Sequence, residues 1–225
     1  MAKVKRTQAA TRKRAVAVLE RLRQAYPDAR CTLDYTNPLE LLVATILAAQ
    51  CTDARVNEVT KPLFKQYRTA ADYADAPQDE LEQAVVTCGF YRNKARNIRK
   101  ACGALVARFG GTVPETMEEL LELDGVGRKT ANVLLGECAQ AAGVVVDTHC
   151  GRVARRLGLT RQTDPVKVEQ DLMKVWPQEA WTIFSHSLVF HGRAVCQARS
   201  PRCSACCVKD LCPFPDTAEG KRIAR

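Results

Sequence analysis

The 225-residue sequence lacks any apolar stretch of the ~18 to 20 residues needed to span a bilayer. Its first 24 residues begin basic and contain no uninterrupted apolar run of the kind that marks a secretory signal. Internal repeats, low-complexity segments and Pro/Gly/Ser linkers are also missing. We therefore expect no membrane insertion and no secretion, and any second domain must pack closely against the first.

Strand-like patterns are nearly absent. The only candidate is the Val-Val-Val run at 144–146, which is short enough to be a buried connection. Helical patterns are frequent instead. Asn37 and Pro38 form a cap and first-turn pair, and apolar residues follow at helical spacing, which predicts a helix over 38–50.

Two more helices carry start signals. Thr116 and Glu119 have the spacing of a capping box, and Asp147 precedes a helical pattern that closes at Gly158. Hydrophobic residues make up 46% of the chain, enough to bury a core, so we predict an all-α fold.

The charge balance is basic, with 34 Lys and Arg against 25 Asp and Glu. Residues 1–30 carry nine basic and two acidic residues, and the stretch 92–108 has six basic residues and no acid. Either stretch alone is compatible with a solvated helix face. Together they favour a polyanion, and nucleic acid in particular, as the partner.

Eleven cysteines are present, and most of them have no shared spacing, as expected of reduced packing residues in a cytoplasmic protein. These scattered cysteines are Cys31, Cys51, Cys88, Cys102, Cys138, Cys150 and Cys207.

The other four, Cys196, Cys203, Cys206 and Cys212, form a C-x6-C-x2-C-x5-C cluster. Four thiolates on short loops can converge on one metal centre, whereas buried free thiols are a poor explanation for cysteines in a basic, Pro-containing loop. Zinc accepts four thiolates, but zinc ribbons usually have two x2-type pairs. An iron-sulfur cube fits the wider spacing better.

Gly125, Val126 and Gly127 lie between two predicted helices. Two glycines flanking one valine allow a tight turn, and the amides at the start of the second helix can then bind a phosphate. The pattern predicts a helix-hairpin-helix that holds a nucleic-acid backbone without reading its sequence.

Two residues near this turn have two possible roles each. Lys129 stands in the first turn of the second helix, where the helix dipole favours a neutral amine that could act as a nucleophile toward a sugar aldehyde carbon. It could equally be another phosphate contact. Asp147 could be only a helix cap, or a partly buried carboxylate beside the chemistry.

Three motifs agree in order and spacing with one known family. The segment 123–132 (Leu-Asp-Gly-Val-Gly-Arg-Lys-Thr-Ala-Asn), the segment 146–149 (Val-Asp-Thr-His) and the cysteine cluster together resemble the endonuclease III family of DNA base-excision glycosylases. The resemblance begins at the Leu-Ala-Ala-Gln-Cys-Thr-Asp segment 47–53 and covers nearly the whole chain.

The resemblance implies a two-domain helix-hairpin-helix DNA glycosylase fold. A six-helix domain over 31–141 would contain the hairpin at about 116–138. Residues 1–30 and 142–225 would form an iron-sulfur domain, and DNA would lie in the groove between the two. The protein would be a monomer associated with the nucleoid.

Residue roles follow from the same resemblance. Lys129 matches the Schiff-base nucleophile and Asp147 the catalytic carboxylate, while His149 is given no proton-transfer role. Gln50 matches the residue that fills the gap left by an extruded base, and Phe90 stands where a side chain wedges against the opposite strand. The implied DNA contacts also include Gly125, Val126, Gly127, Arg199 and Arg202, and the four cluster cysteines would hold a 4Fe-4S cluster.

Several positions depart from the family pattern. Asp124 replaces a common proline and adds negative charge beside the phosphate-binding turn, and Ala48 replaces a serine. The predicted activity is that of a bifunctional DNA glycosylase and apurinic/apyrimidinic lyase that acts on oxidised pyrimidines in double-stranded DNA. The alternatives are a monofunctional adenine-mismatch glycosylase, which lacks the lysine, and a non-catalytic DNA-binding protein or electron carrier.

Overall fold

The computed structural model describes residues 8–139 and 143–225, so the basic residues before Gln8 lie outside the described part. The chain divides into two compact units: unit 1 comprises Met1–Cys31 and Ala142–Arg225, and unit 2 comprises Thr32–Ala141. The described residues form helices and turns without a strand, which confirms the all-α class. None of the helices in these ranges is long and apolar enough to cross a membrane.

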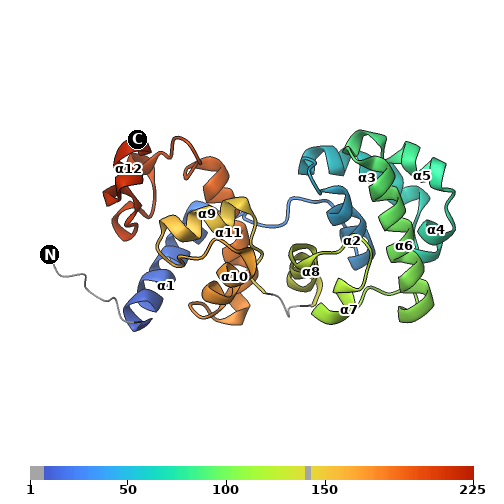
Figure 1. Ribbon diagram of the computed structural model, residues 1–225, viewed down its shortest axis with the longest axis horizontal. Coiled ribbons are helices and arrows are strands. Elements are labelled where there is room, and N and C mark those ends of the chain that lie inside the picture. Colours follow the sequence, from blue (N-terminus) through green and yellow to red (C-terminus); the bar gives the residue numbers. More distant parts are fainter. Residues whose placement is uncertain (1–7, 140–142) are drawn as a thin grey trace. The chain divides into compact units, whose positions relative to one another are not determined.

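Unit 2 is a continuous stretch of chain (Figure 1). Its helices are α2 (Pro38–Leu47), α3 (Asp53–Gln66), α4 (Ala70–Asp75), α5 (Gln78–Ala84), η1 (Val86–Cys88), α6 (Tyr91–Phe109), α7 (Met117–Leu121), α8 (Arg128–Leu134) and the π-helix η2 (Leu135–Ala139). Its described residues thus form seven α-helical segments where six were expected. Part of this division is due to Pro77, which lacks an N–H and keeps Ala76 extended, so that α4 and α5 are separate.

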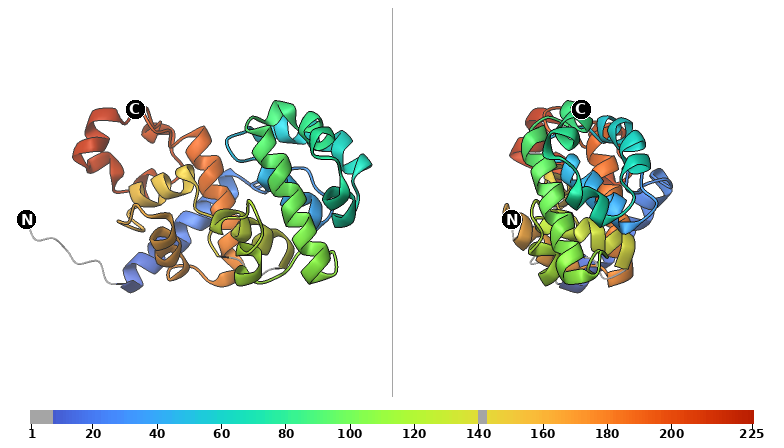
Figure 2. Two further views of the ribbon diagram at one scale, coloured as in Figure 1. Left: turned by 45° about the vertical axis from the view of Figure 1, so that its right-hand side comes forward. Right: turned by 90° about the vertical axis from the view of Figure 1, so that its right-hand side faces the viewer.

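The long helix α6 is the centre of unit 2. Helices α4 and α5 pack along it, as the two views in Figure 2 show. Ile98 and Leu105 of α6 are fully buried, as are Leu42 of α2 and Leu120 of α7. Burial of such side chains contributes roughly 1.5–3 kcal/mol each, so this packing fixes the positions from which the site residues project.

Helix α2 begins as predicted but ends earlier. The side chain of Asn37 accepts a hydrogen bond from the Glu40 amide, and Pro38 occupies the first turn. The prediction of a helix to residue 50 was wrong, because α2 ends at Leu47. Gln50 has a left-handed backbone with φ 53°, which an α-helix cannot contain.

Unit 1 is assembled from both ends of the chain. Its helices are α1 (Gln8–Ala25), α9 (Thr148–Arg156), α10 (Pro165–Met173), η3 (Gln178–Ala180), α11 (Trp181–Ala194), η4 (Cys203–Ala205), η5 (Lys209–Leu211), η6 (Phe214–Asp216) and α12 (Ala218–Ile223). The run 144–146 forms an irregular connection, as predicted, and Val144 is fully buried within it.

The core of unit 1 joins α1 to α9, α10 and α11. Phe184 of α11 is fully buried and stacks on Trp176, with ring centroids 3.6 Å apart. The indole Nε1 of Trp176 donates to the carbonyl of Ala15 in α1 at 3.3 Å. Arg14, also on α1, donates to the carbonyls of Gly158 and Leu211, so the first described helix is bonded to the C-terminal segment.

Truncation of Phe184 tests this core. Phe184→Ala should lower the free energy of unfolding by about 3–5 kcal/mol, because it leaves a cavity against Trp176. Leu121→Ala is the control, since that side chain is 43% exposed and its loss should cost less than about 1 kcal/mol. Denaturant unfolding measures both, and equal losses would contradict the packing described.

Candidate functional site

The turn between α7 and α8 depends on one glycine. Gly125 has φ 80°, which disfavours other residues, and a Cβ added there would lie 3.0 Å from the side chain of Asn97. The Val126 amide donates to the Leu123 carbonyl at 3.1 Å, and Val126 is only 7% exposed, so its side chain anchors the turn.

The backbone of Gly127 does not have the turn conformation that the sequence predicted for it. Its φ is −98° and its ψ is 174°, an extended conformation that any residue adopts, and nothing lies within 4 Å of an added Cβ. The prediction that both glycines serve the tight turn therefore holds for Gly125 alone. Gly127 is the N-cap of α8 and has no side chain that could cover the first amides of this helix.

Lys129 lies in the first turn of α8 with an exposed side chain. It belongs to unit 2, whereas Asp147 belongs to unit 1. Asp147 is half-buried and is the N-cap of α9, where its Oδ1 accepts a hydrogen bond from the Cys150 amide at 2.7 Å. Asp147 is therefore a helix cap, and the cap bond occupies only Oδ1.

His149 contacts Arg152. Its Nδ1 lies 3.1 Å from a terminal guanidinium nitrogen of Arg152, which also donates to the carbonyl of Gly192 at 2.9 Å. Because a guanidinium only donates, Nδ1 is the acceptor in this pair. His149 therefore orients a neighbouring arginine, which is consistent with giving it no proton-transfer role.

Gln50 and Phe90 line the same pocket of unit 2, together with Lys94, Asn97 and Gly125. Both are exposed, and Phe90 keeps 65% of its surface open to solvent. Phe90 has φ 48°, so both residues have left-handed backbone. The structure thus brings together two predicted site residues that are 40 positions apart in the sequence.

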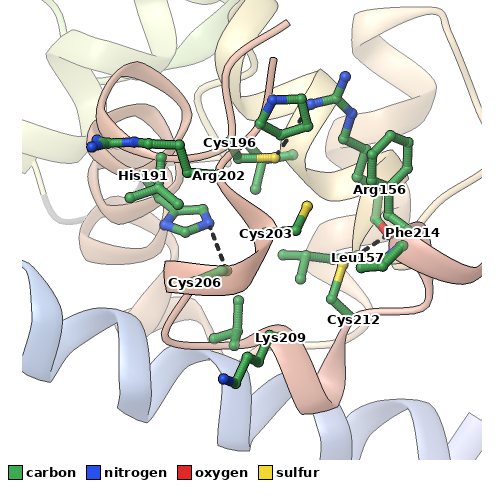
Figure 3. Close-up of a pocket in the computed structure, with 15 residues that line it drawn as sticks. Arg156, Leu157, His191, Cys196, Arg202, Cys203, Cys206, Lys209, Cys212 and Phe214 are labelled. Carbon is green, nitrogen blue, oxygen red and sulfur yellow. Dashed lines mark hydrogen bonds between the residues drawn. The ribbon is translucent and has the colours of Figure 1, made fainter. Parts of the chain in front are cut away.

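The four cluster cysteines line one pocket of unit 1 (Figure 3). The pocket holds about 370 Å³ of space outside the atoms, part of it open to solvent, and its other walls include Val153, Leu157, Val208 and Phe214. Within the described part of the chain, no three His, Cys, Asp or Glu side chains are arranged to hold a single metal ion. All four cluster cysteines are lining residues of this one pocket.

Two of these sulfurs have a side-chain nitrogen within hydrogen-bond distance. A guanidinium nitrogen of Arg156 lies 3.6 Å from Cys196 Sγ, and His191 Nε2 lies 3.5 Å from Cys206 Sγ (Figure 3). Burial raises the pKa of Cys196, and it raises the pKa of Cys212 to about 11. Without a metal these thiols therefore retain their protons.

Arg156 also holds the loop that carries the first cysteine. It is 8% exposed, and its guanidinium donates to the carbonyl of Gln197 at 2.7 Å and to that of Ala198 at 2.8 Å. It lies over the ring of Phe214, 4.3 Å from the centroid, and pairs with Glu219 at 3.6 Å. Sequence reasoning missed this residue, because its partners lie about 40 or more positions further along the chain.

This environment fits a 4Fe-4S group. Each iron of such a cube takes one thiolate, so four cysteines must face one common space, and all four line this pocket. The ligated cube is anionic, and Arg156, Arg202 and Lys209 place cationic side chains along the pocket wall.

The two arginines predicted to meet phosphates differ in their surroundings. Both are exposed. The guanidinium of Arg202 donates to the Ala194 carbonyl, and its amide donates to the Val195 carbonyl at 3.0 Å, so it supports its own loop. Arg199 lies on the exposed part of the same loop.

Comparisons with known proteins agree with this fold. A family model described as the HhH-GPD superfamily of base excision DNA repair proteins matches residues 43–178. An endonuclease III from Synechocystis sp. is 51% identical over 214 residues, which are 95% of this chain and 98% of that protein. One from Bacillus subtilis is 46% identical and covers 86% of this chain and 89% of its own.

A solved structure of a trapped endonuclease III–DNA covalent intermediate is also similar. It has a TM-score of 0.85 and 46% identity, and the match covers 94% of this chain and 97% of that chain. The protein described here is thus a DNA glycosylase of the base-excision class. The chain belongs to the endonuclease III family within the HhH-GPD superfamily.

The hairpin glycines provide a test of the turn. Gly125→Ala should destabilise the protein by about 1–2 kcal/mol from the left-handed backbone, with a further loss because Asn97 must move. Gly127→Ala should change the free energy of unfolding by less than about 0.5 kcal/mol. Thermal unfolding compares the two variants, and a larger loss at Gly127 would contradict the geometry.

Proposed function

We propose that this enzyme is a bifunctional DNA glycosylase and apurinic/apyrimidinic lyase that removes oxidised pyrimidines from double-stranded DNA. The observation that carries the proposal is Lys129, an exposed amine in the first turn of the hairpin's second helix. An amine in the first turn of a helix whose N-cap has no side chain can reach a deoxyribose whose phosphate binds at that helix start.

In the proposed reaction, the damaged base first leaves the stack, at a cost of a few kcal/mol. The Nζ of Lys129 attacks C1′ of the deoxyribose, and the bond from C1′ to the base breaks. The resulting imine acidifies C2′, so that loss of a C2′ proton expels the 3′ phosphate. Asp147 would accept the proton of the attacking amine or stabilise positive charge on the sugar, using the oxygen that the cap bond leaves.

DNA would be held mainly through its phosphates. The backbone amides of the hairpin and the exposed guanidinium of Arg199 would bind phosphate oxygens, and the open space at Gly127 allows a close backbone approach. Gln50 and Phe90 would enter the base stack where the lesion leaves it. Such a protein would act as a monomer on the DNA of the nucleoid.

We also propose that Cys196, Cys203, Cys206 and Cys212 hold a 4Fe-4S cluster. When bound, the cluster supplies four iron–thiolate bonds that order the loops from Val195 to Phe214. This segment needs such bonds, since Val208 and Phe214 are its only buried large hydrophobic residues.

Substitution of the nucleophile tests the lyase proposal. Lys129→Gln should lower borohydride trapping on abasic DNA about 100-fold or more, because the neutral amide forms no imine. Binding measured by gel shift should remain, since the hairpin backbone is unchanged. Lys61→Gln, an exposed lysine of α3, is the charge-matched control and should trap normally. Undiminished trapping by Lys129→Gln would refute the assignment, and failure of the unsubstituted protein to trap would favour a monofunctional glycosylase.

Metal analysis tests the cluster. Protein purified anaerobically should be yellow-brown with about four irons per chain, and Cys203→Ser should lose iron and become protease-sensitive between Val195 and Phe214. Cys138→Ser is the matched control, because that thiol is exposed in unit 2 and should keep the iron content. Stoichiometric zinc in place of iron would refute this assignment.

A further inference from the structure

The pocket of unit 2 that contains Gln50 and Phe90 has an unusual backbone. Among the described residues other than glycine, only these two have positive φ, 53° and 48°. A bulky aromatic residue seldom adopts this conformation. Phe90 nevertheless adopts it while 65% exposed, so burial of its own side chain does not account for the conformation.

One buried lysine donates hydrogen bonds to the turn that contains Gly89 and Phe90. Lys94, the fourth residue of α6, is 4% exposed. Its Nζ donates to the carbonyl of Cys88 at 2.5 Å, and its backbone amide donates to the carbonyl of Phe90 at 3.1 Å. A single residue therefore bonds both sides of the Gly89–Phe90 turn.

Burial of the Lys94 ammonium costs free energy that burial of an apolar side chain would not cost. Desolvation lowers the pKa of Lys94, and the nearby thiols of Cys51 and Cys88 oppose this shift without reversing it. A methionine would fill a similar volume without burying a charge. The feature that only the ammonium provides is the hydrogen bond to the Cys88 carbonyl, at the end of η1 and immediately before the turn.

We infer that Lys94 is a positioning residue for DNA, whose ammonium holds the Cys88–Phe90 turn so that Phe90 projects beside Gln50. The inference rests on the proposed function, in which Phe90 and Gln50 enter the base stack. Lys94 is buried and acts through Phe90 without touching the substrate. Its role is confined to duplex DNA, because a single strand has no opposite strand against which Phe90 could wedge.

Activity on duplex and on single-stranded abasic DNA distinguishes a positioning role of Lys94 from a general role in stability. In iron-loaded full-length protein, Lys94→Met should lower kcat/KM on duplex DNA with one abasic site at least tenfold. Borohydride trapping on a single-stranded abasic oligonucleotide should change less than twofold. Lys61→Met is the control for loss of one positive charge and should match the unsubstituted protein on both substrates. Equal losses by Lys94→Met on both substrates, or no loss on duplex, would overturn the inference.

A double-mutant cycle tests whether Lys94 acts through Phe90. Phe90→Ala should lower duplex activity, and adding Lys94→Met to it should lower activity less than twofold further. Independent losses that multiply would overturn the inference.

A second variant, Gly89→Ala, tests the same turn if Lys94→Met does not fold. It strains the same turn at φ 63°, with nothing within 4 Å of the new Cβ, and should reproduce the duplex-selective loss. Full duplex activity in Gly89→Ala would overturn the inference. Absence of trapping by the unsubstituted protein on both duplex and single-stranded abasic DNA would instead refute the proposed lyase function.

Discussion

Both candidate sites depend on a buried cationic side chain that donates hydrogen bonds to the carbonyls of an irregular loop. Arg156 satisfies the carbonyls of Gln197 and Ala198 beside the first cluster cysteine, and Lys94 satisfies the Cys88 carbonyl beside Phe90. Loops that carry functional side chains have few carbonyl partners of their own, and a buried unpaired carbonyl costs about as much as a lost hydrogen bond. A long cationic side chain from a neighbouring helix supplies the missing donor while its aliphatic part packs in the core. In each unit, helical packing therefore sets the geometry of a loop that has almost no core of its own.

The helix starts and the class of the fold could be predicted from the sequence, because caps are local. Asn37 and Asp147 bond amides three residues ahead, and that distance is visible in a window of four residues. The end of α2 could not be predicted. Neither glycine nor proline stands near Gln50, and its left-handed backbone arises from its surroundings in the fold.

The sequence likewise does not show which basic residues are buried and which are exposed. In the sequence, Lys94 is one of six basic residues in a stretch that could be a solvated face or a nucleic-acid contact. In the structure it is buried, while Arg92 and Arg96 of the same helix are exposed. The hairpin glycines show a related effect, since Gly125 and Gly127 are alike in sequence and only Gly125 needs its conformation. Composition gives the number of charged residues and glycines. Only the packing of the fold determines which charges are buried and which glycines need a left-handed backbone.

The division of the chain also has a consequence for biosynthesis. Unit 2 is one continuous stretch of chain, residues 32–141, so its core can form as soon as that stretch has left the ribosome. Unit 1 cannot form then, because α1 packs against α11 and Arg14 bonds the carbonyl of Leu211, near the opposite end of the chain. Helix α1 therefore cannot complete its packing until Leu211 has been synthesised. The four cluster cysteines emerge after unit 2, so closure of unit 1 belongs to the stage of synthesis after Cys212 has left the ribosome or to the time after release.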